Sequence, residues 1–256
     1  MERWVLMMFC VCFGAAMGSF LNVVAERSCV GRQWWGSERS RCSSCGQVLR
    51  WRDLVPVVSW IALGGRCRYC GAPIGWSCLL TEGTGALVGG LLAWRWGASP
   101  ALLLAATACA GLFLSSLTDL YDRSVHDVVP LASGAAALLL RLLGGTGALV
   151  DGLLGVALGF AVIALLIALS RGGMGWGDGT LMAGTGAALG WKLTILALYL
   201  GFMIGGVVAL LLIALGKVRR KDALPLVPFL ALGSVVTLLA GPQILAFIGI
   251  SAAWPW

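Results

Sequence analysis

The sequence predicts an all-α polytopic membrane protein with about eight transmembrane helices and one long polar insert. Composition is the first reason. Of the 256 residues, 59% are hydrophobic and 11% are charged, whereas a soluble domain averages about 45–50% apolar and about 25% charged residues. The second reason is the arrangement, because the apolar residues form long runs separated by short polar links, as in proteins with several membrane spans.

Eight apolar runs are expected to be the spans. The first covers roughly residues 4–24. It could be mistaken for a signal peptide, but Glu2 lies beside Arg3 in its charged region and the run is close to spanning length, so we interpret it as a retained helix. The others cover roughly residues 79–97, 101–119, 127–143, 149–170, 178–191, 193–215 and 226–249. A span needs about 20 residues, so the short run at 178–191 should tilt little or be partly sheltered by its neighbours.

Small and aromatic residues are placed as membrane helices require. The chain has 37 Gly, and small residues let membrane helices approach closely, because lipid supplies no hydrophobic force between helices. Most of the 12 Trp lie near the ends of apolar runs, where their rings anchor a helix at the membrane interface. Both patterns support the same fold class.

The distribution of Lys and Arg predicts the orientation. With eight spans, 14 of the 18 basic residues fall on one side: eight in the insert, Arg123 and Arg171 in two links, and four between residues 217 and 221. The opposite side receives Arg3, Arg95, Arg141 and Lys192. Because Lys and Arg accumulate in cytoplasmic loops, the insert should be cytoplasmic and both termini should lie outside. Topology therefore accounts for the net charge of +7; membrane lipid is the expected partner and nucleic acid is not.

The predicted organisation has three parts: a first helix at 1–24, a cytoplasmic insert at 25–78 and a helical membrane domain at 79–256. The insert contains two CxxC pairs separated by 21 residues, formed by Cys42, Cys45, Cys67 and Cys70. Four thiolates at this spacing are typical of a structural zinc site. Two disulfides are the alternative, which the reducing cytoplasm disfavours, and free thiols are the other. Gly46 and Gly71 each follow a pair, where a tight turn forms easily, and the single His excludes a site with several His ligands.

Two aspartates lie at the predicted cytoplasmic ends of spans. Asp119 ends the third run and Asp178 begins the sixth, after a glycine-rich segment. Two carboxyl groups held close together can share a proton and act as a base–acid pair on water and a peptide bond. The alternatives are a helix cap for Asp178, since an acidic residue suits a helix start, and an interfacial polar residue for Asp119. From the residues alone both explanations stay open.

Other polar residues on the same link are weaker candidates. Asp122 and Asp127 are expected to be solvated, although either could contact a substrate, and His126 could pair with Asp127. A serine-type site that uses Ser115 or Ser116 with His126 has no supporting motif. The remaining cysteines show no pairing and are expected to be small buried hydrophobic residues. They are Cys10, Cys12, Cys29, Cys78 and Cys109.

Several motifs, taken together, resemble the type IV prepilin peptidases, which are membrane aspartic peptidases of the GxGD type. The motifs are Gly18-Ser-Phe-Leu-Asn-Val-Val24, the cysteine insert from Ser40 to Cys70, Leu79-Leu-Thr-Glu82, Gly173-Met-Gly-Trp-Gly-Asp178 and Pro228-Phe-Leu-Ala-Leu-Gly233. The resemblance covers most of the chain. It implies an eight-helix inner-membrane enzyme whose catalytic aspartates are Asp119 and Asp178.

The resemblance also implies the reaction. Members cut a short basic leader after glycine from pilin or pseudopilin precursors, and then methylate the new N-terminus with S-adenosylmethionine. Methyl transfer is associated with the cytoplasmic insert, so Glu26 and Glu82 are possible participants, and no residue is assigned to the methyl donor. The alternatives are a peptidase without methyltransferase activity, and a non-catalytic scaffold or transporter that keeps the zinc loop.

Three positions depart from the family pattern. The family usually has Pro-Asp eight residues after the first catalytic aspartate, where this chain has His126-Asp127. It usually has Lys two residues after the second, where this chain has Thr180, and Gly before the last-motif proline, where this chain has Val227. The aspartate pair is intact, so these changes should affect contacts with the substrate and efficiency.

Overall fold

The computed structural model describes residues 2–33, 39–170, 174–219 and 224–255. Four residues named in the sequence analysis lie outside these ranges, namely Gly173, Arg171, Arg220 and Lys221. Arg39 lies within them. Within those ranges the secondary structure is helical, apart from two isolated β-bridges. The predicted all-α class is therefore confirmed.

A helix covers each of the eight predicted runs. The long helices are α1 (Glu2–Cys29), α3 (Trp76–Trp96), α4 (Pro100–Asp122), α5 (Val128–Arg141), α6 (Thr146–Leu169), α7 (Trp176–Leu189), α8 (Trp191–Ala214) and α9 (Val227–Phe247). The short elements are α2 (Val58–Ala62) and the 3₁₀ turns η1 (Trp51–Asp53) and η2 (Leu142–Gly144). In the described part of the chain, five helices are long and apolar enough to cross a membrane, namely α1, α4, α6, α8 and α9. A membrane protein follows from this, and the full count of eight crossings stays a prediction.

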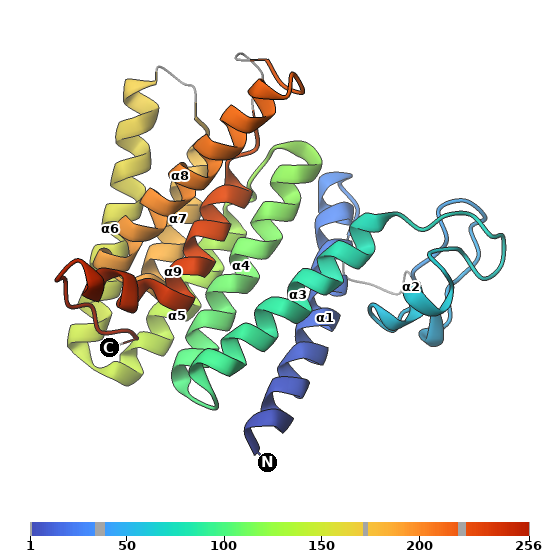
Figure 1. Ribbon diagram of the computed structural model, residues 1–256, viewed down its shortest axis with the longest axis horizontal. Coiled ribbons are helices and arrows are strands. Elements are labelled where there is room, and N and C mark those ends of the chain that lie inside the picture. The colour runs from blue at the N-terminus through green and yellow to red at the C-terminus, as the bar shows by residue number, and fades with distance from the viewer. Residues whose placement is uncertain (1, 34–38, 171–173, 220–223, 256) are drawn as a thin grey trace. The chain divides into compact units, whose positions relative to one another are not determined.

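The chain forms two compact units, residues 1–98 and 99–256. In the first unit α1 packs antiparallel against α3 (Figure 1). The contact is made by glycines at a spacing of four: a β-carbon added at Gly14 would lie 2.2 Å from the carbonyl oxygen of Gly85, and one at Gly89 would lie 2.3 Å from that of Cys10. Backbones this close leave no room for side chains. The predicted role of small residues is confirmed here.

The second unit is a bundle of α4 to α9 (Figure 1). The short helix α7 contacts α4, α5, α6, α8 and α9, and its residues from Leu181 to Leu189 are all buried. Its 14 residues span about 21 Å at 1.5 Å per residue, which is less than the ~30 Å hydrocarbon core. The expectation that this run is sheltered by its neighbours is therefore met.

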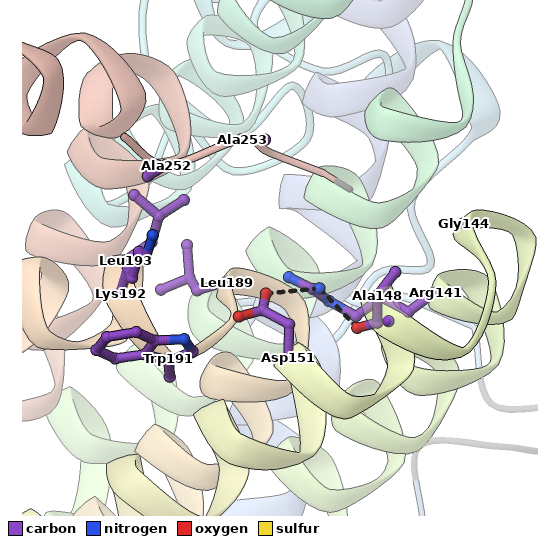
Figure 2. A pocket seen from close by; sticks show the side chains of 11 residues that line it. Arg141, Gly144, Ala148, Asp151, Leu189, Trp191, Lys192, Leu193, Ala252 and Ala253 are labelled. Atoms are coloured by element: carbon purple, nitrogen blue, oxygen red, sulfur yellow. Dashed lines mark hydrogen bonds and ion pairs between the residues drawn. The ribbon is translucent and has the colours of Figure 1, made fainter. Parts of the chain in front are cut away.

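The C-terminal end of α7 is held by a buried cation. Arg141 is fully buried, and its Nη2 donates to the carbonyl oxygen of Ala188 at 3.0 Å. Its Nη1 donates to the Asp151 carboxylate and to the Ala148 carbonyl oxygen, both at 2.9 Å (Figure 2). The indole N–H of Trp254 donates to the same Ala188 oxygen at 2.9 Å. Since the last carbonyls of a helix have no partner within it, these donors satisfy a helix end that stops inside the bundle. Arg141 and Asp151 also line a pocket of about 410 Å³.

Candidate active site and metal centre

The two predicted catalytic aspartates come from adjacent helices of the second unit. Asp119 lies in the last turn of α4, and Asp178 lies in the first turn of α7. These helices pack together. Both residues are buried, with 7% and 9% of their surface exposed. Two carboxyl groups that the sequence separates by 58 intervening residues therefore lie at the same end of two packed helices.

Neighbouring elements hold the Asp119 carboxylate and the helix turn that contains Asp178. The Oδ2 of Asp119 accepts a hydrogen bond of 3.2 Å from the backbone N–H of Val227, at the start of α9. The first turn of α7 lies against Val125, because a β-carbon at Gly177 would lie 2.6 Å from the Val125 Cβ. Helices α4, α7 and α9 thus converge on the carboxyl pair.

A side-chain hydrogen bond crosses the site. The hydroxyl of Thr180 lies 2.7 Å from Oδ1 of Asp127, to which it donates, and 3.0 Å from the carbonyl oxygen of Gly177. Asp127 immediately precedes α5, and Thr180 follows Asp178 by two residues. One departure from the family pattern, Thr180, therefore contacts Asp127, the residue that follows a second departure, His126.

The third departure is also accounted for. Val227 contacts Asp119 through its backbone N–H, which every residue except proline supplies. Sequence patterns gave no sign of this contact, because a backbone donor leaves no trace in side-chain identity. The first helical N–H groups have no partner in their own helix, so the α9 terminus has a free donor for the carboxylate.

The weaker candidates are placed differently. Asp122, His126 and Asp127 are exposed, and Asp122 accepts hydrogen bonds from the backbone and hydroxyl of Ser124. The hydroxyl of Ser116 donates to the Leu112 carbonyl, and that of Ser115 is buried without a partner among the described residues. Neither serine is hydrogen-bonded to His126 in the described part of the chain, so the structure gives no support to a serine-type site.

The four predicted metal ligands gather in the insert of the first unit. The sulfurs of Cys42, Cys45, Cys67 and Cys70 all lie within 4.8 Å of one another. Each pair forms the same small loop. The N–H of Gly46 donates to the Cys42 carbonyl and the N–H of Gly71 to the Cys67 carbonyl, both at 2.9 Å. Both glycines have a positive φ, +71° and +70°, as the sequence predicted for tight turns.

The geometry of the sulfurs suits zinc. At the usual Zn–S distance of about 2.3 Å, tetrahedral ligands are about 3.8 Å apart, and the sulfurs of Cys42 and Cys70 are 3.9 Å apart. All four thiols are free, so the disulfide alternative is not realised. The donor set of four cysteines therefore fits a Zn²⁺ ion.

The thiols differ in their affinity for protons. The backbone N–H groups of Cys45 and Ser44 lower the pKa of Cys42 to about 6. At Cys70 the backbone N–H of Ala72 lowers the pKa, but desolvation and the three neighbouring thiols outweigh it and raise the pKa to about 11. Since only thiolates ligate zinc, metal binding at neutral pH must displace protons from this cluster.

An ion pair joins η1 to the second cysteine loop. Asp53 accepts a hydrogen bond of 2.7 Å from Nε of Arg68 and one of 3.1 Å from the N–H of Arg50. The hydrogen bond from the Arg68 guanidinium is the main cause that holds the pKa of Asp53 below its usual value, and the Arg50 N–H contributes in the same direction. Arg68 also brings a positive charge next to the ligand Cys67, where it can offset the charge of the thiolates.

The predictions for the remaining cysteines and for the two glutamates have mixed outcomes. Among the cysteines outside the cluster, Cys109 is buried and Cys10, Cys29 and Cys78 are half-buried, but Cys12 is exposed, so the expectation of burial is wrong for Cys12. A membrane helix can expose a small apolar side chain to lipid, and no burial against protein is needed there. Of the two glutamates that the resemblance suggested, Glu82 is buried and Glu26 is exposed.

The apolar helical bundle and its two buried aspartates give this protein the architecture of a membrane aspartic peptidase, to which a cysteine cluster is added. Comparisons with known proteins specify the family. Residues 12–96 match the model of the bacterial peptidase A24 N-terminal domain, and residues 106–210 match that of the type IV leader peptidase family. The chain belongs to the type IV leader peptidase family, and it is an enzyme.

Similar proteins with the name prepilin leader peptidase/N-methyltransferase span almost the whole chain. The protein of Burkholderia pseudomallei strain 1026b is 34% identical over 94% of this chain and 87% of its own length. That of Pseudomonas aeruginosa is 30% identical over 91% and 90%, and that of Aeromonas hydrophila is 31% identical over 94% and 93%. No solved structure gives a significant match.

Proposed function

We propose that this enzyme cleaves the basic leader of type IV prepilin-like precursors after glycine, with Asp119 and Asp178 as its catalytic pair. The observation that carries the proposal is the placement of the pair: two buried carboxyls lie at the adjoining ends of the packed helices α4 and α7. Such a pair can hold one shared proton. One carboxylate then takes a proton from the attacking water while the other gives one to the scissile group.

The proposed site is on the cytoplasmic side of the inner membrane. Its support is the charge bias, because Arg123 and Lys217 lie at the same end of the bundle as both aspartates. A prepilin with its basic leader in the cytoplasm and its apolar helix in the bilayer would place its cleavage point at the cytoplasmic end of the bundle, beside the aspartates. The division into a first helix at 1–24, a zinc-binding insert at 25–78 and a peptidase domain at 79–256 belongs to the same proposal.

Methylation of the trimmed N-terminus is the second activity that we propose, and the names of the relatives support it. The new amine would form a bond to the methyl carbon of S-adenosylmethionine, with release of the thioether S-adenosylhomocysteine and a proton. Zinc on Cys42, Cys45, Cys67 and Cys70 would act as a structural ion.

The test is co-expression with a candidate prepilin, followed by mass analysis of the pilin N-terminus. Asp119→Asn and Asp178→Asn should each stay in the membrane and lower cleavage by at least about 10³-fold, because neither can complete the shared-proton pair. The matched control is Asp122→Asn, on the exposed side of the same helix, which should still cleave. Normal cleavage by either buried-site variant would refute the assignment. A trimmed but unmethylated pilin from the unmodified enzyme would indicate a peptidase alone, and an untrimmed one a non-catalytic protein.

A further inference from the structure

Glu82 is a buried carboxylate outside the aspartate site, and neutral donors from three segments converge on it. It lies in the second turn of α3 and is 5% exposed. Its Oε1 accepts a hydrogen bond of 2.7 Å from the hydroxyl of Ser19 on α1, and the thiol of Cys78 lies 3.6 Å from the same oxygen. Its Oε2 accepts a hydrogen bond of 2.6 Å from the backbone N–H of Val57, in the insert. The carboxylate therefore links both long helices of the first unit to the insert.

The residue that Glu82 contacts in the insert has a strained backbone. Val57 has φ +62° and ψ −50°, and the N–H of Val58 donates to the Pro56 carbonyl at 2.6 Å. These are the features of the γ-turn with positive φ, which is rare and strained, and a β-branched residue at positive φ is an outlier. Such a conformation persists only where its surroundings enforce it. The short bond from the Val57 N–H to a carboxylate is the contact that can enforce it.

The strained turn determines how the insert begins its return to the membrane helices. Helix α2 starts at Val58, and the ring of its Trp60 packs at a tilt of 49° against Trp76, the first residue of α3, with ring centroids 4.7 Å apart. Gly65 packs against the Trp60 ring just before the second cysteine pair. The polar contact at Glu82 and the aromatic contact at Trp76 thus fix the part of the insert that leads to Cys67 and Cys70.

We propose that Glu82 anchors the insert to the α1–α3 pair and is a positioning residue for methyl transfer. In this proposal it acts through its hydrogen bond with the Val57 N–H. This inference rests on the proposed methyltransferase activity, but it is independent of the aspartate pair, because Asp119 and Asp178 belong to the unit of residues 99–256. Loss of the anchor should therefore separate the two activities: cleavage continues and methylation fails.

The decisive variant is Glu82→Gln in the full-length, zinc-loaded protein, assayed with a prepilin peptide and S-adenosylmethionine. Glutamine keeps the shape of the side chain but carries no charge, so the Val57 N–H loses its bond to a charged carboxylate. Loss of a bond to a charged acceptor should speed hydrogen exchange at the Val57 amide by about tenfold or more and lower methylation by a similar factor. Cleavage should stay within about twofold of the unmodified enzyme, and zinc content should not change.

Two further variants separate anchoring from general stability. Ser19→Ala removes a donor to the same carboxylate but keeps the Val57 bond, so it should leave most of the methylation. Val57→Gly in the Glu82→Gln background removes the cost of positive φ, so it should restore part of the lost methylation. If Glu82 only held α1 against α3, a change at Val57 would restore nothing.

The proposal is overturned if Glu82→Gln exchanges its Val57 amide at the normal rate, if it methylates normally, or if cleavage and methylation fall together. If the unmodified enzyme cleaves without methylating, the methyltransferase part of the proposed function fails, and amide exchange alone decides whether Glu82 is the anchor.

Discussion

At the scale of single residues, the contact between Asp127 and Thr180 joins the link that follows α4 to the first turns of α7, next to the aspartate pair. Asp119 ends α4, a short link leads to Asp127, and Asp127 binds Thr180, which is two residues from Asp178. A hydrogen bond with an ionised acceptor is stronger than a neutral one. The contact therefore fixes the first turn of α7 relative to the end of α4, and with it the separation of the two carboxyls.

Removal of the Thr180 hydroxyl should loosen the aspartate pair. Thr180→Val keeps the shape of the side chain but has no donor for Asp127, so we expect kcat for leader cleavage to fall about tenfold while KM changes little, which is the size of one charge-assisted hydrogen bond. Thr180→Ser keeps the hydroxyl and is the matched control. Steady-state cleavage of a prepilin peptide measures both. Equal rates for the valine and serine variants would show that the contact has no role in positioning.

At the scale of helices, close packing through glycine defines the bundle around α7. A β-carbon at Gly155 on α6 would lie 2.2 Å from the carbonyl oxygen of Gly186, and one at Gly184 would lie 2.1 Å from that of Pro130 on α5. These positions let α7 sit with its backbone against two neighbours. A helix shorter than the hydrocarbon core is then covered by protein from Leu181 to Leu189.

Substitution at such a position should separate the helices. Gly155→Val should lower the free energy of unfolding by roughly 1–3 kcal/mol or more, because the side chain overlaps the α7 backbone. The matched control is Gly206→Val on α8, where an added β-carbon meets nothing within 4 Å. Thermal unfolding of the detergent-solubilised variants compares the two. If both unfold at the same temperature, the packing that we describe between α6 and α7 is wrong.

The sequence predicted the positions of these helices but not how their ends are satisfied. Apolar runs locate helices because lipid-facing residues must be apolar over the whole length of a span, and each run does contain a helix. Arg141 was predicted only as a basic residue on the outer side. Its contacts with Ala188 and Asp151 depend on where α7 stops in space, which no local pattern encodes.

The two candidate sites were predictable to different degrees. The cysteine cluster follows from local spacing, since each CxxC loop determines its own geometry, and the structure brings all four sulfurs together. Asp119 and Asp178 could be singled out from their positions at the ends of apolar runs and from the family motifs. The contacts that Val57 makes with Glu82, and Val227 with Asp119, could not be predicted because both use backbone N–H groups.

At the scale of the whole molecule, the residues that we propose for the two activities lie in different compact units. The cysteine cluster and Glu82 belong to residues 1–98, and the aspartate pair belongs to residues 99–256. The insert has little regular structure: between the end of α1 and the start of α3, its described residues form the short α2, a 3₁₀ turn, loops and isolated bridges. A small domain of this kind needs a metal or another cross-link to be stable, whereas the helical bundle has a buried core of its own.

Loss of zinc should therefore affect the units unequally. Cys42→Ser, which removes one ligand, should lower zinc content from about one ion per chain and expose the insert to proteolysis, because metal binding supplies much of the folding free energy in such sites. Cys12→Ser, at an exposed position on α1, is the matched control and should keep its zinc. Helix content and leader cleavage should persist in both variants, while methylation should fail in the first. Metal analysis, limited proteolysis and N-terminal mass analysis together test this. A Cys42→Ser protein with full zinc and a protease-resistant insert would contradict the metal assignment. Loss of cleavage together with zinc would show that the aspartate pair depends on the insert.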